Sequence, residues 1–128
     1  MKPLLTTFTL VFTLMFSSNS FAGWTKVDKN MGEVTFYVDF ERIRKVDGFV
    51  YWWELSDYLK PTPHTDLSVK TYLQGDCKLF RKKVLSWTFH REPMGNGNPR
   101  YVGKTNDKWD YPSPNSAMEG ILKSVCSR

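Results

Sequence analysis

Histidine and cysteine are scarce in this sequence, with two residues of each among 128. Neither a Gly-x-Ser-x-Gly nor a His-Glu-x-x-His motif occurs, and the carboxylates are scattered along the chain. The histidines, His64 and His90, stand apart, and with two cysteines they are a poor set for structural zinc. We therefore expect a protein that is not an enzyme and holds no metal or cofactor. Carboxylates that converge only in space are the alternative.

A long hydrophobic run is also missing, because the apolar region at 4–16 is too short for a comfortable membrane span. This region follows Lys2 and precedes the small-x-small sequence Ser-Phe-Ala at 20–22, an order typical of a secretory signal peptide. We predict that residues 1–22 are removed and that 23–128 form a single domain with no transmembrane segment. An uncleaved anchor helix is the alternative.

Cysteine is absent from the first 76 residues, so the sequence lacks the lipid-attachment cysteine of bacterial lipoproteins. Cys77 and Cys126 are an even number in a chain predicted to be exported, which is typical of a disulfide in an oxidising compartment. A domain this small benefits from such a bond. Two free or metal-bound thiols are the alternative. The expected location is the periplasm, the cell surface or the medium.

Bulky residues alternate with polar ones through most of the predicted domain, the period-2 pattern of half-buried strands. The pattern predicts strands at 24–29, 33–40, 48–58, 67–74, 79–91 and 100–104. Residues 41–47 are predicted to be a turn or one helical turn with Ile43 inward. This connection is too long for a two-residue hairpin, although Asp47-Gly48 supplies turn chemistry.

Two strands carry a conflict between their pattern and a single buried face. The strand at 48–58 has aromatic residues in both phases, so either the sheet curls over itself or a partner chain covers it. In the strand at 79–91, Arg81 and Lys83 fall in phase with Leu85. Either a bulge shifts the register or the start of that strand projects past the core.

The last predicted element is a helix near the C-terminus. Four apolar residues fall at i, i+3, i+4 and i+7, and Cys126 lies on their face: Met118, Ile121, Leu122 and Val125. The helix begins either at Ser113 with Pro114 behind it or at Ser116 with Glu119 as a capping box. If this helix packs on the sheet, Cys77 at the end of a strand is the natural partner of Cys126.

Basic residues gather in the second half of the chain. The candidate binding patch comprises Arg81, Lys82, Lys83, Arg91, Arg100, Lys104 and Lys108. Such a patch fits acidic partners, for example sulfated glycans, acidic protein segments or lipid head groups, and an ordinary solvated face is the alternative. Nucleic acid is not expected in an exported protein. Haem or another small ligand at His90 is a further alternative, whereas His64, in a proline-rich loop, is expected to be solvated.

The sequence resembles the surface-adhesin protein E family of Gram-negative bacteria. The matching residues, in the family's order, are Trp24, Tyr37-Val38-Asp39, Ile43-Arg44-Lys45, Gly48, Val50, Trp53, Leu55, Asp57-Tyr58, Ser68-Val69-Lys70, Asp76-Cys77, Gly95-Asn96-Gly97, Trp109, Pro112 and Cys126. The resemblance implies an α+β fold, with about six antiparallel strands, a C-terminal α-helix packed on the sheet and a disulfide between the two. It also implies dimerisation and binding of host matrix or plasma proteins.

The chain departs from the founding adhesins, which are anchored by lipid, because it lacks the attachment cysteine. The predicted function is an exported, non-enzymatic binding module that contacts host matrix or plasma proteins, or other acidic macromolecules, through exposed basic residues. A soluble periplasmic structural or envelope protein without adhesin activity is the alternative.

Overall fold

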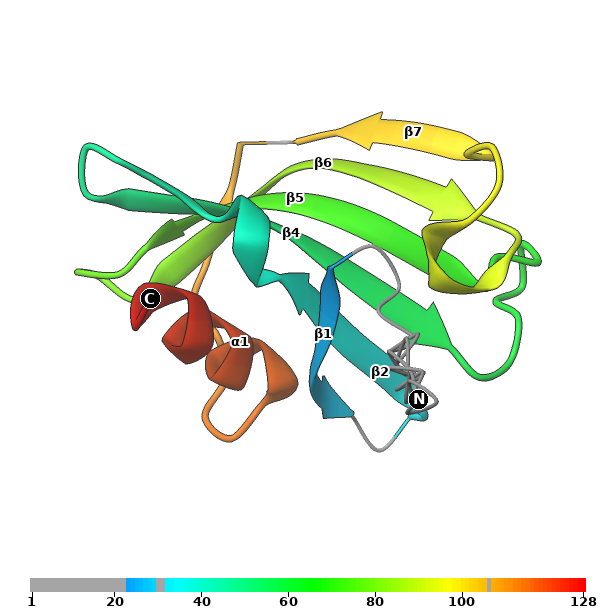
Figure 1. The fold of residues 1–128 in the computed structure, drawn as a ribbon, viewed down its shortest axis with the longest axis horizontal. Helices are drawn as coiled ribbons and strands as arrows, with labels where there is room; N and C mark the ends of the chain where they lie inside the picture. Colours follow the sequence, from blue (N-terminus) through cyan, green and yellow to red (C-terminus); the bar gives the residue numbers. More distant parts are fainter. Residues whose placement is uncertain (1–22, 30–31, 106) are drawn as a thin grey trace, which may run out of the picture.

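The computed structural model of the protein describes residues 23–29, 32–105 and 107–128. The predicted signal peptide at 1–22 lies outside the described residues, as does most of the turn at 30–32. The main strands form one antiparallel sheet in the order β1-β2-β4-β5-β6-β7 (Figure 1). Their bounds are β1 Trp24–Lys29, β2 Val34–Asp39, β4 Phe49–Tyr58, β5 Ser68–Asp76, β6 Arg81–His90 and β7 Tyr101–Lys104. These bounds confirm the six predicted strands.

Two short strands join the same sheet outside this path. β3 (Arg44–Val46) pairs with β4, and β8 (Trp109–Asp110) pairs with β6. A 3-10 turn, η1 (Phe40–Arg42), precedes β3. Asp47 and Gly48 then form the two-residue turn of a β3–β4 hairpin, both with positive φ, as such turns require. Our expectation that this connection excludes a two-residue hairpin was wrong, because β3 was not predicted.

A bulge at Leu85 resolves the conflict in β6. Tyr72 pairs with Ser86, whereas the next residue of β5, Leu73, pairs with Val84, so Leu85 is the extra residue. The side chains on either side of a bulge change phase. Val84 therefore shares a face with its partner Leu73, whereas Arg81 and Lys83 turn to the opposite face. The bulge is the first of the two alternatives predicted.

The hydrophobic core lies on one face of the sheet, which we call the inner face. Its fully buried members come from β2, β4, β5 and the C-terminal helix: Val38, Val50, Trp52, Leu73, Ile121, Leu122 and Val125. Gly75 of β5 lies beneath them, and a Cβ there would stand 2.8 Å from the Trp52 ring and 3.1 Å from Leu122. Glycine at this position lets the helix and the indole reach the sheet.

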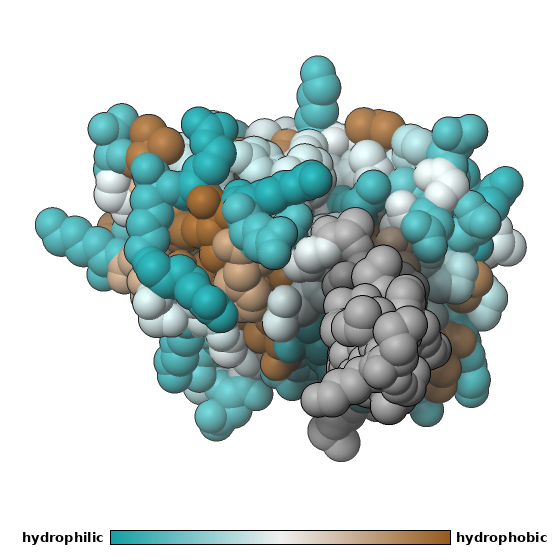
Figure 2. Space-filling model, in the orientation of Figure 1, coloured by the Kyte–Doolittle hydropathy of each residue, from teal (hydrophilic) through white to brown (hydrophobic). Residues whose placement is uncertain are grey.

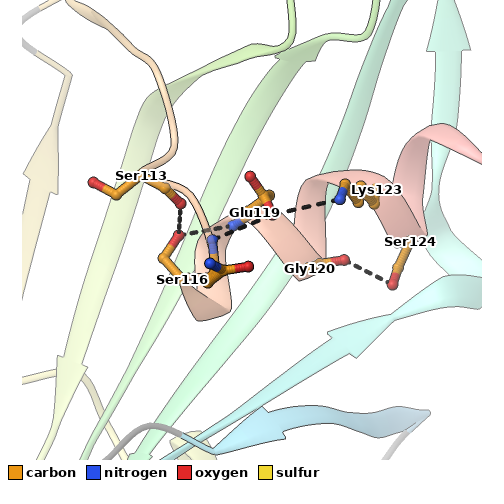
Figure 3. Close-up of polar contacts among 7 residues, drawn as sticks. Ser113, Ser116, Glu119, Gly120, Lys123 and Ser124 are labelled. Atoms are coloured by element: carbon orange, nitrogen blue, oxygen red, sulfur yellow. Dashed lines mark hydrogen bonds and ion pairs between the residues drawn. The ribbon is translucent and has the colours of Figure 1, made fainter.

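The helix, α1 (Ala117–Cys126), begins at the second of the two predicted caps. Ser116 Oγ accepts a hydrogen bond of 3.1 Å from the Glu119 backbone N–H and donates one of 2.7 Å to the Ser113 carbonyl (Figure 3). Lys123 Nζ lies 3.4 Å from Glu119 Oε1, one turn further on. The Ser116 contact gives a partner to the Glu119 amide, one of the first-turn N–H groups that have none within the helix.

α1 covers one end of the inner face, beside β1, while the loop that follows β6 lies at the other end of the sheet (Figure 1). That loop contains a second 3-10 turn, η2 (Pro93–Gly95), which contacts β4, β5 and β6. The helix and the loop thus both pack on β4, the strand that has aromatic residues on both of its faces.

The disulfide joins the end of β5 to the end of α1. Cys77 and Cys126 are bonded, with their Cα atoms 5.7 Å apart and a sequence separation of 49. Cys77 follows Asp76, and Cys126 is the last residue of the helix. The bond therefore holds the C-terminal helix on the sheet, as predicted.

Removing the disulfide is expected to destabilise the protein and to release α1 first. Closing a loop of this length restricts the unfolded chain by an amount on the order of 4 kcal/mol. The double variant Cys77→Ser/Cys126→Ser should show a clearly lower melting temperature, and hydrogen exchange should be fastest in α1. Wild-type protein reduced with dithiothreitol is the matched control and should behave alike. Two thiols reacting per denatured, unreduced wild-type chain would contradict the bond.

Candidate ligand-binding surface

The outer face of the sheet, opposite the core, carries a continuous aromatic surface. Tyr51 and Trp53 of β4 point to this face, and Tyr72 of β5 pairs with Trp53. The Trp53 and Tyr72 ring centroids are 4.8 Å apart, and those of Tyr51 and Tyr72 are 6.2 Å apart. All three rings are half-buried. They therefore present aromatic area to solvent on a rigid element.

A cleft of about 450 Å³ opens beside this aromatic surface. Its lining comes from β1, β2, η1, β4, β5, β6 and the η2 loop: Trp24, Asp39, Arg42, Trp53, Lys70, Thr88, Met94, Gly95 and Asn96. Sites for small ligands fall in this size range and combine aromatic walls with a few convergent polar groups. This cleft is the candidate site.

Buried polar anchors hold the η2 loop against the outer face as one wall of the cleft. Ser68 Oγ donates to the Glu92 carbonyl at 2.6 Å and accepts from the Gly95 N–H at 2.8 Å. Asp57 Oδ1 accepts from the Met94 N–H at 2.8 Å. A fully buried hydroxyl with both roles satisfied is costly to displace. The wall is therefore set before any ligand arrives.

His90 is a further anchor of this loop, with 2% of its surface exposed. Its Nδ1 lies 3.2 Å from the Gly97 carbonyl, which can only accept, so Nδ1 carries the proton. In the neutral imidazole, Nε2 then accepts from the Thr88 hydroxyl at 2.9 Å. Neither nitrogen is available to iron, which removes the haem alternative at His90. His64 is exposed, as expected.

The cleft is lined by one acidic and two basic side chains, so one positive charge has no acidic partner within it. Asp39, 3% exposed, caps η1 by accepting from the Glu41 N–H at 3.2 Å, and its other oxygen lies 3.3 Å from Arg42 Nε. The stem of Lys70 packs on Gly95, where a Cβ would stand 2.9 Å from Lys70 Cδ. Within the described part of the chain Lys70 makes no ion pair. Its ammonium is the uncompensated charge.

A second group of aromatic and basic side chains, which we call the Trp109 cluster, lies further along the outer face. Arg81 Cζ and Lys83 Nζ lie 4.3 and 4.4 Å from the centroid of the Trp109 ring, which stacks on Phe49 at 6.0 Å. Cations at this distance are attracted to the electron-rich ring face. Arg81 also pairs with Asp76 at 3.1 Å and Lys83 with Asp107 at 2.9 Å. The bulge in β6 is what brings the two cations here.

The structure does not bring the seven predicted basic residues into one patch. Lys82 pairs with Gly75 and lies on the inner face. Arg91 and Arg100 lie at the opposite end of β6 from Arg81, about 30 Å along a ten-residue strand. Lys104 and Lys108 are exposed. Of the seven, Arg81 and Lys83 share a cluster, the one around Trp109.

Arg100 has a structural role that its sequence context does not reveal. Its Nε and Nη2 donate to the two carboxylate oxygens of buried Asp66 at 2.7 and 2.6 Å. These hydrogen bonds lower the pKa of Asp66 below its usual value, despite burial. The pair lines a hollow of about 450 Å³ with His64 and Phe89, but its charges already satisfy each other. We therefore do not choose this hollow as the site.

On the face drawn in Figure 2 the residues are mainly hydrophilic, with hydrophobic ones gathered between α1 and the β3–β4 hairpin. A groove lined by Lys45, Gly48, Phe49, Val50 and both cysteines has a volume of about 180 Å³. This is below the usual size of a ligand site.

Among the described residues no three His, Cys, Asp or Glu side chains are grouped to hold a metal ion. In the same part of the chain no helix is long and apolar enough to span a membrane.

Sequence reasoning missed the cleft as a site. Trp24, Arg42 and Lys70 belong to three separate segments, and only the strand register places them together. The available signal was phase: Trp53 alternates with the buried Trp52, so one of the two must face away from the core. The Trp24 and Trp53 positions also appear among the residues that carry the family resemblance.

The fold is that of a small disulfide-stapled antiparallel sheet with an open aromatic face. The family model for surface-adhesin protein E matches residues 24–127, and the chain belongs to this family of surface adhesins. No curated protein sequence matches the chain.

Solved structures of one bacterial protein share the fold. Crystal form II of Haemophilus influenzae protein E has a TM-score of 0.65 and 19% identity, covering 83% of this chain and 88% of that one. A second structure of H. influenzae protein E has a TM-score of 0.59 at 18% identity, with coverages of 83% and 85%. For protein E from non-typeable H. influenzae these values are 0.57, 18%, 83% and 76%. The comparison confirms the α+β fold.

One ionisable group lies apart from both outer-face sites. Glu54 is buried on the inner face, where its Oε2 accepts from Trp52 Nε1 at 3.2 Å. Burial raises the pKa of Glu54 from 4.5 to about 7, against the opposing effects of the Trp52 hydrogen bond and the charge of Lys82. A buried carboxyl of this kind favours its neutral form.

The stability of the wild-type protein is expected to fall as the pH rises through 7. Because the folded pKa of Glu54 is raised, its contribution is fully present below the unfolded value of 4.5 and lost above about 7. The loss is on the order of 3 kcal/mol. Urea unfolding at pH 5 and pH 8 should show this fall in wild type but much less in Glu54→Gln. Glu41→Gln, at an exposed carboxyl, is the control. Identical pH dependence in all three proteins would contradict the assignment.

Proposed function

We propose that the protein is an exported, non-enzymatic binding module whose outer sheet face contacts host matrix or plasma proteins or other acidic macromolecules. The observation that carries this proposal is the outer face itself. Trp53, Tyr72 and Tyr51 form a half-buried aromatic surface there, away from the helix-covered core.

The composition of this face supports a binding role. Aromatic residues, methionine and arginine are enriched where proteins bind macromolecules, and tyrosine and tryptophan offer large contact areas at low entropic cost. Trp53, Met94 and Arg42 lie within one cleft, and Trp109 with Arg81 lies further along. The buried polar groups around the cleft, Asp39 and Ser68, serve to hold the fold, which favours binding over catalysis.

The Trp109 cluster supports an acidic partner. Arg81 and Lys83 are held over the indole, so they reach a ligand with less conformational entropy to lose, although an acidic partner must share or displace their ion pairs with Asp76 and Asp107. The net charge of the whole chain is +5, which favours association with acidic surfaces at low ionic strength. Only the pair in the Trp109 cluster, rather than all seven predicted residues, is proposed to make this contact.

Neutralising the Trp109 cluster is expected to weaken binding to an acidic partner roughly tenfold. Two partly exposed charge pairs each contribute up to about 1 kcal/mol, and salt screens both. Arg81→Gln/Lys83→Gln should be measured by surface plasmon resonance against a panel of purified matrix and plasma proteins at two salt concentrations. Arg44→Gln/Lys45→Gln, which removes the same charge from exposed β3, is the matched control.

Near-ultraviolet circular dichroism should show that both double variants keep the wild-type fold. If no purified matrix or plasma protein binds the wild type above a charge-matched control protein, the adhesin role is wrong. An equal loss of affinity in the two double variants would mean that net charge causes the effect and that the Trp109 cluster is not a binding site.

Export should leave a mature chain that begins at Gly23. The charged start, the apolar region and the Ser-Phe-Ala sequence at 20–22 direct cleavage after Ala22. N-terminal sequencing of protein from the periplasmic fraction checks this. Ala22→Pro is expected to block cleavage and to retain the longer chain, and an intact Met1 on the wild-type periplasmic protein would contradict the prediction.

A further inference from the structure

We propose that the cleft between Trp24 and Trp53 binds an acidic sugar, a pyranose ring that carries one carboxylate, as in the uronic acid units of a glycan chain. This inference rests on the proposed binding role of the outer face and names the ligand chemistry for one site on it. The site differs from the Trp109 cluster, so the two proposals depend on different residues.

The aromatic lining favours a sugar ring. The C–H bonds of a pyranose carry partial positive charge, and they pack on the negative face of an indole. The cleft has two such rings, Trp24 on β1 and Trp53 on β4. Trp53 lies 4.8 Å from Tyr72, centroid to centroid, so its orientation is set before a ligand binds. A preset ring loses little rotamer freedom on binding.

The charge of the cleft favours one carboxylate per ring. Arg42 is offset by Asp39, whereas Lys70 is not offset by any acid among the described residues. A single uncompensated ammonium matches a ligand unit with a single negative charge. A heavily sulfated glycan carries several charges on each disaccharide and would need a cluster of cations, which this cleft lacks.

The remaining polar groups suit hydroxyls. Asn96 is exposed at the rim and offers an amide with both donors and an acceptor. With His90 as the neutral imidazole protonated at Nδ1, the Thr88 hydroxyl donates to Nε2, which leaves the Thr88 oxygen able to accept from a sugar. Polar and apolar groups are balanced in this lining, whereas an acyl chain or a haem needs a mainly apolar wall.

The probe for this site is tetragalacturonate, added to the purified, 15N-labelled protein. The chain has five tryptophans, and each gives one indole N–H signal by NMR. The signals of Trp24 and Trp53 are expected to shift with saturation, while those of Trp52 and Trp87 on the inner face stay in place. A titration that leaves the Trp24 and Trp53 signals unmoved overturns the proposal.

Two further probes separate the sugar from its charge. A neutral galactose tetrasaccharide has the rings without the carboxylates, and a tetraglutamate peptide has the carboxylates without the rings. Both are expected to bind at least tenfold more weakly than tetragalacturonate. Equal affinity for the neutral sugar overturns the role of Lys70, and equal affinity for the peptide assigns the cleft to acidic protein segments instead.

Variants place the charge at Lys70. Lys70→Gln is expected to lower the affinity for tetragalacturonate tenfold or more, because it removes a hydrogen bond to a charged group. Lys104→Gln, at an exposed lysine of β7, is the matched control and should bind as wild type. Unshifted indole signals in the free Lys70→Gln protein would show that the fold is intact. Equal affinities in the two variants overturn the assignment.

This inference and the proposed function fail in different ways. Matrix-protein binding that depends on Arg81 and Lys83, with no indole shift on adding tetragalacturonate, removes the sugar site and leaves the binding role. Indole shifts with tetragalacturonate in a protein that binds no matrix or plasma protein retain the sugar site and remove the adhesin role.

Discussion

The contact between α1 and the sheet across Gly75 organises the rest of the molecule. Leu122 and the Trp52 indole meet over this glycine, and any Cβ there would occupy the space they need. The disulfide at the end of the same strand keeps the helix within reach of that contact. Once one phase of β4 is committed to the helix, the other phase, with Tyr51 and Trp53, must face the opposite way. The aromatic outer face is a consequence of where the core lies.

Most buried polar groups of the outer side maintain the architecture. Asp39 caps η1, Ser68 holds the η2 loop, and Asp66 holds Arg100. Each of these groups is desolvated, and each has its hydrogen bonds satisfied, so each contributes a fixed local geometry instead of an open reactive site. The groups left for a ligand are therefore the ones at the surface of the cleft, with Lys70 and the tryptophans foremost. This division is that of a binding surface built on a rigid scaffold.

The single bulge in β6 has an effect beyond its own strand. Without Leu85 as an extra residue, Arg81 and Lys83 would lie in phase with Trp87 on the inner face. With it, both cations reach the Trp109 ring on the outer face, and Val84 takes the inner position. The inserted residue thus lets the apolar residues of both halves of β6 face the core, although the two halves have opposite alternation. It also places charge beside the aromatic surface, where an acidic partner can meet it.

Period-2 alternation determined the six main strands, and the apolar stripe at Met118–Val125 determined the helix, because both patterns depend on local spacing alone. The pairing of two cysteines in an exported chain also followed from the sequence. The short strands β3 and β8 escaped prediction, since three and two residues carry too little pattern. Only the tertiary structure decided which basic residues meet. Arg100 forms hydrogen bonds with Asp66, which lies 34 residues away in sequence. Lys70 and Trp24 line the same cleft because of how β1, β2, β4 and β5 pair. Such contacts depend on register and bulges, which a linear pattern of residue types does not specify.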